Sequence, residues 1–557
     1  MKLNQYLLLA TSCSCLLLTM VGLARAADPA GQAAATLPGI YDVRRFGAVG
    51  DGVTLGTEAI QRAIDAVSRA GGGRLVFPSP GTYLTGSIVL KDNVILEIPV
   101  GATLLGSRQY GDYREDTGVC AYPEGVDRCL IYAKGARNIG LTGRGTISGN
   151  GKPAALLQKD NQIDKHNQRP MLVRFEDCTG IHVDQLTLVE AFSWCFHFAR
   201  CKDLRVQGLS IFNRRQDGID LESCQDATVS DCNIKAGDDA IVLLANKNMA
   251  TRNVTITNCI LQSRWAGVRF GPLSYGDIDN VAISNCVVHD CGGGGIKIAM
   301  LEGGTIKNGT FSNITMDRVV CPILIMLIDW QEIDSGSPHI MPVGKISHLI
   351  FSHIVGTAAG GPAESPDTGG TLFLQGHPRQ DLEDIALSDI DLTLAGGGTR
   401  QQAARRNMTD ADRMPHSGNW PENQGWGVPP AAALYARHVK GLSLDRVRFS
   451  MARPDLRSTV FLRQSSDINI AGLTTGNSAG HAAARLTLLD CRDALISGCQ
   501  DHHGGESFLA VEGPQTRGIS LLGNSLVGFE HEVQRQAESP ESAVQSKIPV
   551  LRRSYGE

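Results

Sequence analysis

A repeat of about 20 to 30 residues is the feature that most constrains how this chain folds. The tripeptides "TNC" at Thr257, "SNC" at Ser284 and "SNI" at Ser312 recur 27 and 28 residues apart, and "SDC" at Ser230 precedes them by 27. Each is followed by alternating apolar residues. This spacing of short strands predicts an all-β, single-stranded parallel β-helix, in which the repeated Asn or Asp forms a ladder of side chains, one per coil.

One segment departs from this pattern and predicts a helix. In "TEAIQRAIDAVSRAGGG", which begins at Thr57, apolar residues follow the i, i+3, i+4, i+7 spacing: Ile60, Ala63, Ile64 and Val67. Thr57 is the expected N-cap and Gly71 the expected C-terminal stop. Because the end of a solenoid must be covered, we expect this helix to cap the N-terminal coil.

The N-terminus resembles a secretory signal peptide over residues 1–26, with a basic start at Lys2, an apolar stretch and the small-residue sequence "ARA" ending at Ala26. We therefore expect a secreted or periplasmic protein. Removing Lys2 and Arg25 would change the formal net charge from −5 to −7. This mild acidity argues against nucleic acid and anionic membranes as partners, and we expect a monomer.

The repeats predict one β-helix domain over residues 39–535, with an N-terminal cap region at 39–110 and a C-terminal tail at 536–557. Residues 396–430 interrupt the repeats with a polar stretch that is rich in Gly and Pro. A long insertion in a solenoid falls on one face and is often functional. A disordered surface loop is the alternative interpretation.

The cysteines have two possible uses. An exported protein with many Cys first suggests disulfide bonds. However, two sets are evenly spaced along the repeats, namely Cys178, Cys201 and Cys224, and Cys232, Cys259 and Cys286. Equal spacing predicts stacked, buried free thiols that pack as small hydrophobic groups. Two further pairs are candidate disulfides: Cys120 with Cys129, and Cys491 with Cys499.

Five successive coils align on a pattern whose third and fifth positions are apolar. They are "WCFHF" from Trp194, "DGIDL" from Asp217, "DAIVL" from Asp239, "AGVRF" from Ala266 and "GGIKI" from Gly294. Coils stack about 4.8 Å apart, so equivalent positions form columns. Because the apolar positions face the core, the fourth position faces outward. This outward column contains His197, Asp220, Val242, Arg269 and Lys297. The second column is uniformly small and predicts a groove floor: Cys195, Gly218, Ala240, Gly267 and Gly295.

The alignment also gathers carboxylates. Asp217, Asp238 and Asp239 fall on neighbouring coils, with Asp220 close by. A Gly-Asp-Asp turn is the purely structural interpretation, but it does not predict this gathering. Strict alternation would direct Asp238 and Asp239 to opposite faces unless the backbone turns at Gly237. Paired carboxylates suit glycoside hydrolysis, in which one protonates the leaving oxygen and another activates water.

The flanking residues suggest an anionic sugar as the ligand. Arg269 and Lys297 would bind a uronate carboxylate, Arg as a fork and Lys as a point charge. Trp194 and His197 are expected to contact the substrate on the other side of the carboxylates, together with Asp220.

At these residues the chain resembles the pectin-lyase-like superfamily and, within it, glycoside hydrolase family 28, the polygalacturonases. "FGAVGDG" from Phe46 is similar to the superfamily's N-terminal cap. "RQDGID" stands where the family has "NTDGID", and "GDD" at Gly237–Asp239 matches its second motif. The run from Trp194 through His197 to Cys201 is similar to the bacterial "W-x-x-H-x-x-x-C" segment. The resemblance covers roughly residues 40 to 530 and implies a right-handed β-helix.

The resemblance implies inverting hydrolysis of acidic, α-linked, plant-type pectic polysaccharides or oligosaccharides, without a cofactor or metal ion. Asp238 would be the general acid, and Asp217 and Asp239 would hold the attacking water as base. Inverting enzymes usually separate acid and base by about 6.5–9.5 Å.

Two positions depart from the family. Ala266 replaces a His, and Gly295 replaces an Arg, for which Arg269 is the candidate substitute. The lost Arg suggests a modified substrate such as rhamnogalacturonan, or an exo-acting enzyme.

Two other functions stay open from the sequence. A pectate-type lyase would hold Ca²⁺ with the Asp cluster and use Arg269 or Lys297 as base. A non-catalytic carbohydrate-binding solenoid would use the same groove without releasing sugar.

Overall fold

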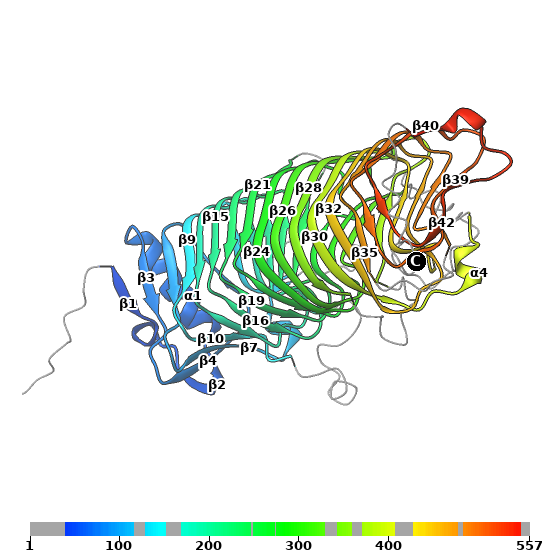
Figure 1. Ribbon diagram of the computed structural model, residues 1–557. Helices are drawn as coiled ribbons and strands as arrows, with labels where there is room; N and C mark the ends of the chain where they lie inside the picture. Colours follow the sequence, from blue (N-terminus) through cyan, green and yellow to red (C-terminus); the bar gives the residue numbers. More distant parts are fainter. Residues whose placement is uncertain are drawn as a thin grey trace, which may run out of the picture. The chain divides into compact units, whose positions relative to one another are not determined.

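The computed structural model describes residues 39–115, 128–151, 169–246, 249–272, 274–328, 342–358, 370–406, 427–476 and 483–546. Successive coils contribute parallel strands that pair with the strands of the coils before and after them (Figure 1). The predicted all-β, parallel β-helix is therefore confirmed. The expected signal peptide lies outside the described residues. Across the described ranges, no helix is long and apolar enough to cross a bilayer.

One face of the coils is a 15-stranded parallel sheet, which carries the predicted columns. Its strands are β5 (Ile88–Val89), β8 (Cys129–Lys134), β11 (Met171–Glu176), β14 (Phe196–Ala199), β17 (Ile219–Glu222), β20 (Ile241–Leu244), β23 (Ala266–Phe270), β25 (Gly294–Met300), β27 (Ile323–Leu327), β29 (Leu372–Gln375), β31 (Ala431–Arg437), β33 (Ser458–Arg463), β36 (Leu486–Leu489), β39 (Gly505–Glu512) and β42 (Phe529–Arg535).

The strand register confirms the predicted outward column residue by residue. His197 pairs with Asp220, Asp220 with Val242, Val242 with Arg269, and Arg269 with Lys297. The alternate residues of these strands are apolar and lie in the core inside the coils. Period-two alternation thus places every member of the column on the outer face of the 15-stranded sheet.

The other faces of the coils form a second, larger parallel sheet. In the second half of the chain its strands are long: β24 (Ile278–Cys291), β26 (Thr305–Val319), β28 (Lys345–Thr357), β30 (Leu382–Gly396) and β32 (Val439–Arg453). Pairing continues beyond residue 535, because β43 (Val544–Ser546) pairs with β40 (Arg517–Leu522). Residues assigned to the tail therefore contribute to the β-helix.

The predicted N-terminal helix is α1 (Thr57–Arg69), and its four periodic apolar residues are fully buried. The helix packs against β3 (Gly73–Val76), β5 and β6 (Val94–Glu97) in the first coils (Figure 1). The prediction of Thr57 as N-cap is wrong, because Gly56 holds that position. The Thr57 hydroxyl instead accepts a hydrogen bond from the backbone N–H of Gly86 at 2.7 Å, which ties the helix to a coil.

The repeated Asn and Asp residues form the predicted ladder. Asn258 donates from Nδ2 to Asp231 Oδ1 at 3.2 Å, and Asn313 donates to Asn285 Oδ1 at 3.3 Å. All four residues have φ between 54° and 57°. Asn and Asp tolerate this left-handed conformation better than other side chains do, which explains why they recur at the turn.

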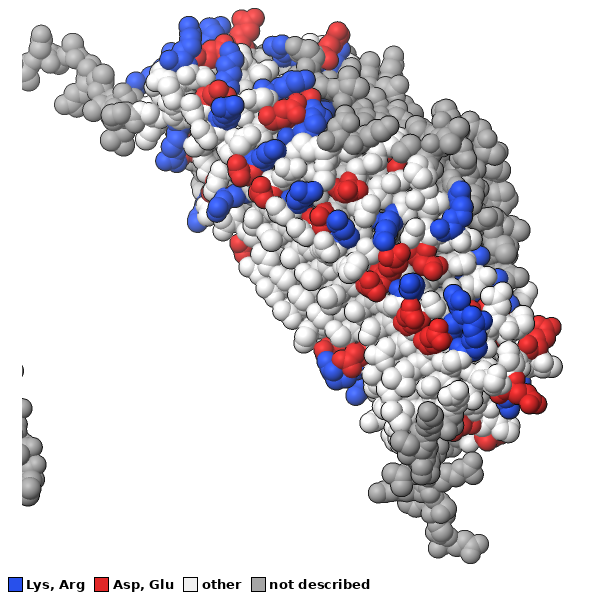
Figure 2. Space-filling model, turned by 90° about the horizontal axis from the view of Figure 1, so that it is seen from above, with Lys and Arg blue, Asp and Glu red and all other residues white. Residues whose placement is uncertain are grey.

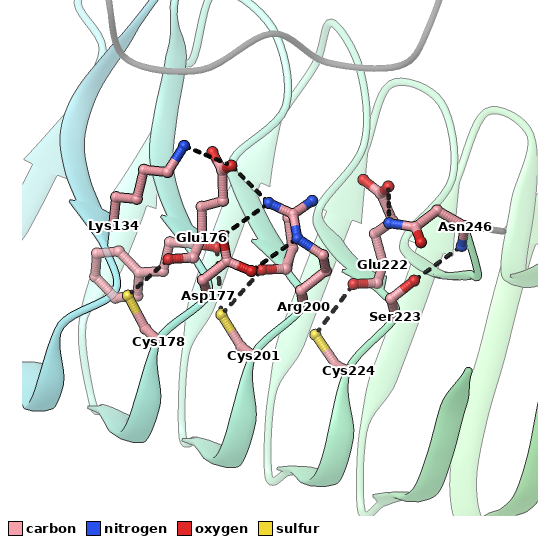
Figure 3. A network of polar contacts seen from close by, with 12 residues as sticks. Lys134, Glu176, Asp177, Cys178, Arg200, Cys201, Glu222, Ser223, Cys224 and Asn246 are labelled. Carbon is pink, nitrogen blue, oxygen red and sulfur yellow. Dashed lines mark hydrogen bonds and ion pairs between the residues drawn. The ribbon is translucent and has the colours of Figure 1, made fainter. Parts of the chain in front are cut away.

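The evenly spaced cysteines are free and buried, as predicted. Figure 3 shows Cys178, Cys201 and Cys224 in a row on consecutive coils. The thiol of Cys201 donates to the carbonyl oxygen of Phe175 at 3.3 Å. The second set has the same character: Cys232, Cys259 and Cys286.

The suggested disulfide between Cys491 and Cys499 is wrong, because both thiols are free. They flank the extended strand β37 (Arg492–Ser497). A strand of this length separates its ends by much more than the roughly 7 Å that a disulfide spans between Cα atoms. Cys120, the partner suggested for Cys129, lies outside the described residues.

A thiol titration checks the stacked cysteines. Burial raises the pKa of Cys201 well above its usual value and excludes reagents. We expect negligible reaction of the six stacked thiols in the folded protein. After denaturation without reductant, all six should react with a thiol reagent. A near-zero count in the denatured protein would show disulfides and contradict the fold analysis.

Candidate active site

Three carboxylates gather at the corner where the chain enters the 15-stranded sheet. Asp217 lies just before β17, and Asp238 and Asp239 lie just before β20. One oxygen atom from each lies within 4.8 Å of the others. Gly237 permits this turn through a close approach, because a Cβ there would lie 2.2 Å from the carbonyl oxygen of Arg214. Asp238 and Asp239 therefore serve one site although they are adjacent in sequence.

The nearest oxygens of these carboxylates lie closer together than the about 6.5–9.5 Å that usually separates the acid and base carboxyl groups as a whole. The closest oxygens of all three lie within 4.8 Å of one another. The physical reason is the coil stacking, since residues at equivalent corners of neighbouring coils are held about 4.8 Å apart by the backbone.

Backbone N–H groups and one cation hold the two buried carboxylates. The N–H of Asp239 donates to Asp217 Oδ1 at 2.9 Å, and the N–H of Ala266 donates to Asp239 Oδ1 at 2.8 Å. The guanidinium of Arg269 lies 3.3 Å from Asp239 Oδ2. These contacts fix both side chains and favour a negative charge on Asp239. Asp238 is the most exposed of the three Asp residues.

A fourth carboxyl, Asp220, lies beside this cluster and is 1% exposed. Its carboxylate oxygens accept no hydrogen bond from a basic or neutral side chain, and its side-chain hydrogen-bond partner is the neighbouring carboxyl group of Asp217. Burial, and then the charge of Asp239, raise the pKa of Asp220 well above its usual value. Burial, and then the charge of Asp220, likewise raise the pKa of Asp217. The cluster therefore retains protons at pH values where exposed carboxyl groups have lost them.

The two predicted cations lie next to the cluster on adjacent strands. Arg269 donates from Nε to the carbonyl oxygen of Gly271 at 3.3 Å, in addition to its ion pair with Asp239. The Nζ atom of Lys297 lies 4.1 Å from the ring centroid of Trp265. This cation–π contact holds the buried ammonium group on the strand that follows that of Arg269. Trp265 was not predicted as a site residue, although it directly precedes the aligned segment at Ala266.

The two departures from the family motifs have structural explanations. At Ala266 the backbone N–H supports Asp239 whatever side chain is present. At Gly295 a Cβ would lie 2.8 Å from the carbonyl oxygen of Pro322, so a longer side chain does not fit without a shift. Arg269 thus supplies a guanidinium group one coil away, and this group also forms an ion pair with Asp239.

His197 and Trp194 lie on the preceding coil, but His197 is fully buried. Its Nε2 lies 2.8 Å from Glu222 Oε2, and its ring and that of Trp194 pack in T-shaped geometry with centroids 5.3 Å apart. Burial lowers the pKa of His197, which favours the neutral imidazole. In this structure His197 contacts Glu222 and Trp194, and its predicted contact with substrate stays a prediction. Glu222 was missed, although it follows Asp220 by two residues on the same face.

The coils that precede the site carry a network of ion pairs along the 15-stranded sheet, shown in Figure 3. Glu176 lies 3.2 Å from Lys134 Nζ and 2.5 Å from Arg200 Nη2. Arg200 also pairs with Asp177 at 2.8 Å. This network neutralises the buried charge of Glu176 two coils before the Asp cluster.

The Asp cluster is the one group of potential metal ligands found within the described ranges. Ca²⁺ takes six to eight oxygen ligands. Here the guanidinium of Arg269 already lies 3.3 Å from Asp239 Oδ2 and compensates its charge. The donor set therefore fits a divalent cation poorly.

The exterior carries charges of both signs. On the face shown in Figure 2, acidic and basic side chains are interspersed among uncharged ones. Exposed ion pairs of this kind include Arg318 with Asp290 and Arg446 with Asp389, each at 2.7 Å. Such a mixture produces no large field of a single sign over the part of that face drawn in colour.

Comparisons with known proteins agree with this architecture. The model of the family described as glycosyl hydrolases family 28 matches residues 75–411. A probable polygalacturonase from Arabidopsis thaliana is 26% identical over 377 residues, covering 65% of this chain and 75% of the relative.

Two solved structures share the fold. A hyperthermoactive exopolygalacturonase from Thermotoga maritima aligns with a TM-score of 0.54 at 20% identity, covering 65% of this chain and 90% of the other. A family 28 exopolygalacturonase from Yersinia enterocolitica aligns with a TM-score of 0.57 at 18% identity, covering 83% and 78%.

The raised pKa of Asp220 makes stability depend on pH. Because the folded protein binds this proton more tightly, the contribution of Asp220 becomes unfavourable as pH rises above the unfolded pKa of about 3.9. We expect Asp220→Asn to raise the melting temperature at pH 7 by on the order of 2 °C, and to change it much less at pH 4.

Asp203→Asn is the matched control. Asp203 is exposed, so its replacement removes a carboxylate without removing the cost of burying a charge. A lower melting temperature for Asp220→Asn at pH 7 would show that the ionised carboxylate is stabilising, and would contradict this account.

Proposed function

As a member of glycosyl hydrolases family 28 the chain is a glycoside hydrolase, and we propose that it cleaves α-linked, uronate-containing pectic polysaccharides or oligosaccharides. The observation that carries this proposal is the placement of Arg269 and Lys297 on the outward column, one and two coils beyond three clustered Asp carboxylates. The carboxylates supply acid and base, and the cations suit the carboxylate of a uronate.

In the proposed mechanism Asp238 is the general acid. Its greater exposure suits a group that must reach the glycosidic oxygen of a bound polymer. Asp217 and Asp239 together hold the attacking water and accept its proton. One oxygen of each side chain accepts a hydrogen bond from a backbone N–H, which holds both carboxylates in place and supports this role.

We further propose that the reaction inverts the anomeric centre. The short oxygen separation resembles the roughly 5–5.5 Å of retaining enzymes, in which one of two carboxylates attacks the sugar. That rule describes sites with two carboxylates. Here two carboxylates can share one water while a third protonates the leaving group, which supports direct attack by water.

The roles of Asp238 and Asp217 predict different responses to the leaving group. We expect Asp238→Asn to remove most activity on natural substrates and less on activated aryl glycosides, where protonation matters little. Asp217→Asn should reduce both activities alike, because water must attack in each. Steady-state kinetics on the two substrate types measure this. The reverse pattern would exchange the two roles, which the raised pKa of Asp217 would then explain.

The stereochemical outcome is a separate prediction. Proton NMR of the first-formed product should show an inverted anomeric configuration. Retention would contradict the water-attack mechanism. An unsaturated, ultraviolet-absorbing product that disappears with a chelator would identify a lyase, and the absence of any released sugar would identify a binding protein.

The proposed uronate contact predicts a substrate-dependent effect of Lys297→Ala. Loss of a charged contact in a water-poor groove costs on the order of 2–4 kcal/mol. We therefore expect kcat/KM to fall strongly on acidic substrates and little on neutral analogues. Lys202→Ala, an exposed lysine outside the column, is the control. Equal losses on both substrate types would exclude a carboxylate-binding role.

A further inference from the structure

Two carboxyl groups of one coil, those of Asp217 and Asp220, contact each other in the candidate active site. Asp217 is 8% exposed and Asp220 is 1% exposed. The side chain of Asp220 forms a hydrogen bond with the carboxyl group of Asp217. Because an ionised carboxylate only accepts hydrogen bonds, this contact requires a proton between the two groups. One residue of the pair therefore holds a proton while the other carries a negative charge.

The backbone favours the negative charge on Asp217. Its Oδ1 atom accepts a hydrogen bond from the N–H of Asp239 at 2.9 Å, which stabilises the ionised form. Within the described ranges, no backbone N–H and no basic or neutral side chain donates to either oxygen of Asp220. The charges of Asp238 and Asp239 oppose ionisation of both residues, and Arg269 compensates that of Asp239.

A further buried carboxylate, that of Glu222, lies close to Asp220. The two residues are two positions apart on β17, so their side chains leave the same face of the strand about 7 Å apart. Asn246 donates from Nδ2 to Glu222 Oε1 at 3.4 Å (Figure 3), and Nε2 of His197 lies 2.8 Å from Oε2. Burial opposes a charge on Glu222, but the hydrogen bond with His197 outweighs it, and the pKa of Glu222 is lowered to about 2. Glu222 is therefore ionised and repels a negative charge on Asp220.

His197 reaches Glu222 diagonally, from one strand to the next. It is in register with Asp220, whereas Glu222 is in register with Ala199, whose methyl group leaves room for the imidazole. Because the Glu222 carboxylate only accepts, Nε2 of His197 carries the proton of their hydrogen bond. Burial lowers the pKa of His197, the contact with Glu222 opposes this, and the charge of Arg174 on β11 adds to the lowering. A neutral imidazole leaves the negative charge of Glu222 uncancelled beside Asp220.

From these contacts we infer that Asp220 holds the shared proton and donates it in a hydrogen bond to Asp217, and that the charge of Glu222 keeps the proton there. The inference rests on the proposed function, in which Asp217 acts as base. A base that takes a proton from water must be ionised, and a proton on Asp220 leaves Asp217 in that form. Asp220 and Glu222 thus act through Asp217 as positioning residues.

A double-mutant cycle tests the role of Glu222. Glu222→Gln keeps the size of the side chain but removes its charge, so the proton can move to Asp217. We expect kcat on an acidic oligogalacturonate to fall by at least about fivefold in the parent protein. In the Asp220→Asn background, where residue 220 cannot ionise, the same change should cost less than about twofold.

Equal losses in the two backgrounds, or a Glu222→Gln protein that does not fold, would show a purely structural role and overturn the inference. The conservative variant Glu222→Asp retains the charge and should recover most of the activity that Glu222→Gln loses. An aspartate variant as slow as the glutamine variant would also overturn it.

A matched pair of substitutions tests the hydrogen bond from Asp220. The amide of Asp220→Asn can still donate to the Asp217 carboxylate, whereas Asp220→Leu fills similar space without a donor. We expect kcat of the Asn variant to exceed that of the Leu variant by at least about tenfold, and equal values would overturn the inference while leaving the proposed hydrolase intact. A parent protein that releases no sugar from any acidic oligosaccharide would overturn the proposed function, and the inference with it.

Discussion

The backbone hydrogen bonding between successive coils is the interaction on which the rest of the structure depends. It holds each coil about 4.8 Å from the next, and the register of β14, β17, β20, β23 and β25 is continuous through the site. A side chain's neighbours are therefore decided by its position in the repeat. The site needs no separate scaffold, because its acids and cations occupy repeated positions on successive coils.

This register explains how much the sequence could reveal. Period-two alternation and repeat spacing were sufficient to predict the outward column from His197 to Lys297 and the stacked thiols. They could not predict which group the end of a long side chain contacts. His197 faces outward as expected, yet it turns to Glu222 and is buried beneath its neighbours. The short distance between the nearest carboxylate oxygens follows from the coil spacing.

Other features depend on contacts between segments far apart in the chain. Asp455 accepts a hydrogen bond from the N–H of Gly398, and Arg457 donates one to the carbonyl oxygen of Pro429. The sequence around Gly398 and Pro429 gives no indication of either contact. The misassigned N-cap at Thr57 has the same cause, since its hydroxyl is engaged by Gly86 of a later coil. The cluster of four Asp residues is the place where local rules of stability are most clearly violated. Burial of like charges there opposes folding, and backbone N–H groups and Arg269 compensate only in part.

The free, stacked thiols also bear on how such a chain reaches its native state. Sheets built from parallel, non-local pairing form slowly, because each coil must close before its contacts are made. During that time the cysteines are exposed and can be oxidised. A disulfide formed by chance between two coils would link residues that lie apart in the native stack. Refolding yield should therefore be governed by a race between coil formation and oxidation. A reducing buffer, and not the redox-shuffling mixture used for disulfide-bonded secreted proteins, is the appropriate medium for recovering this protein from a denatured state.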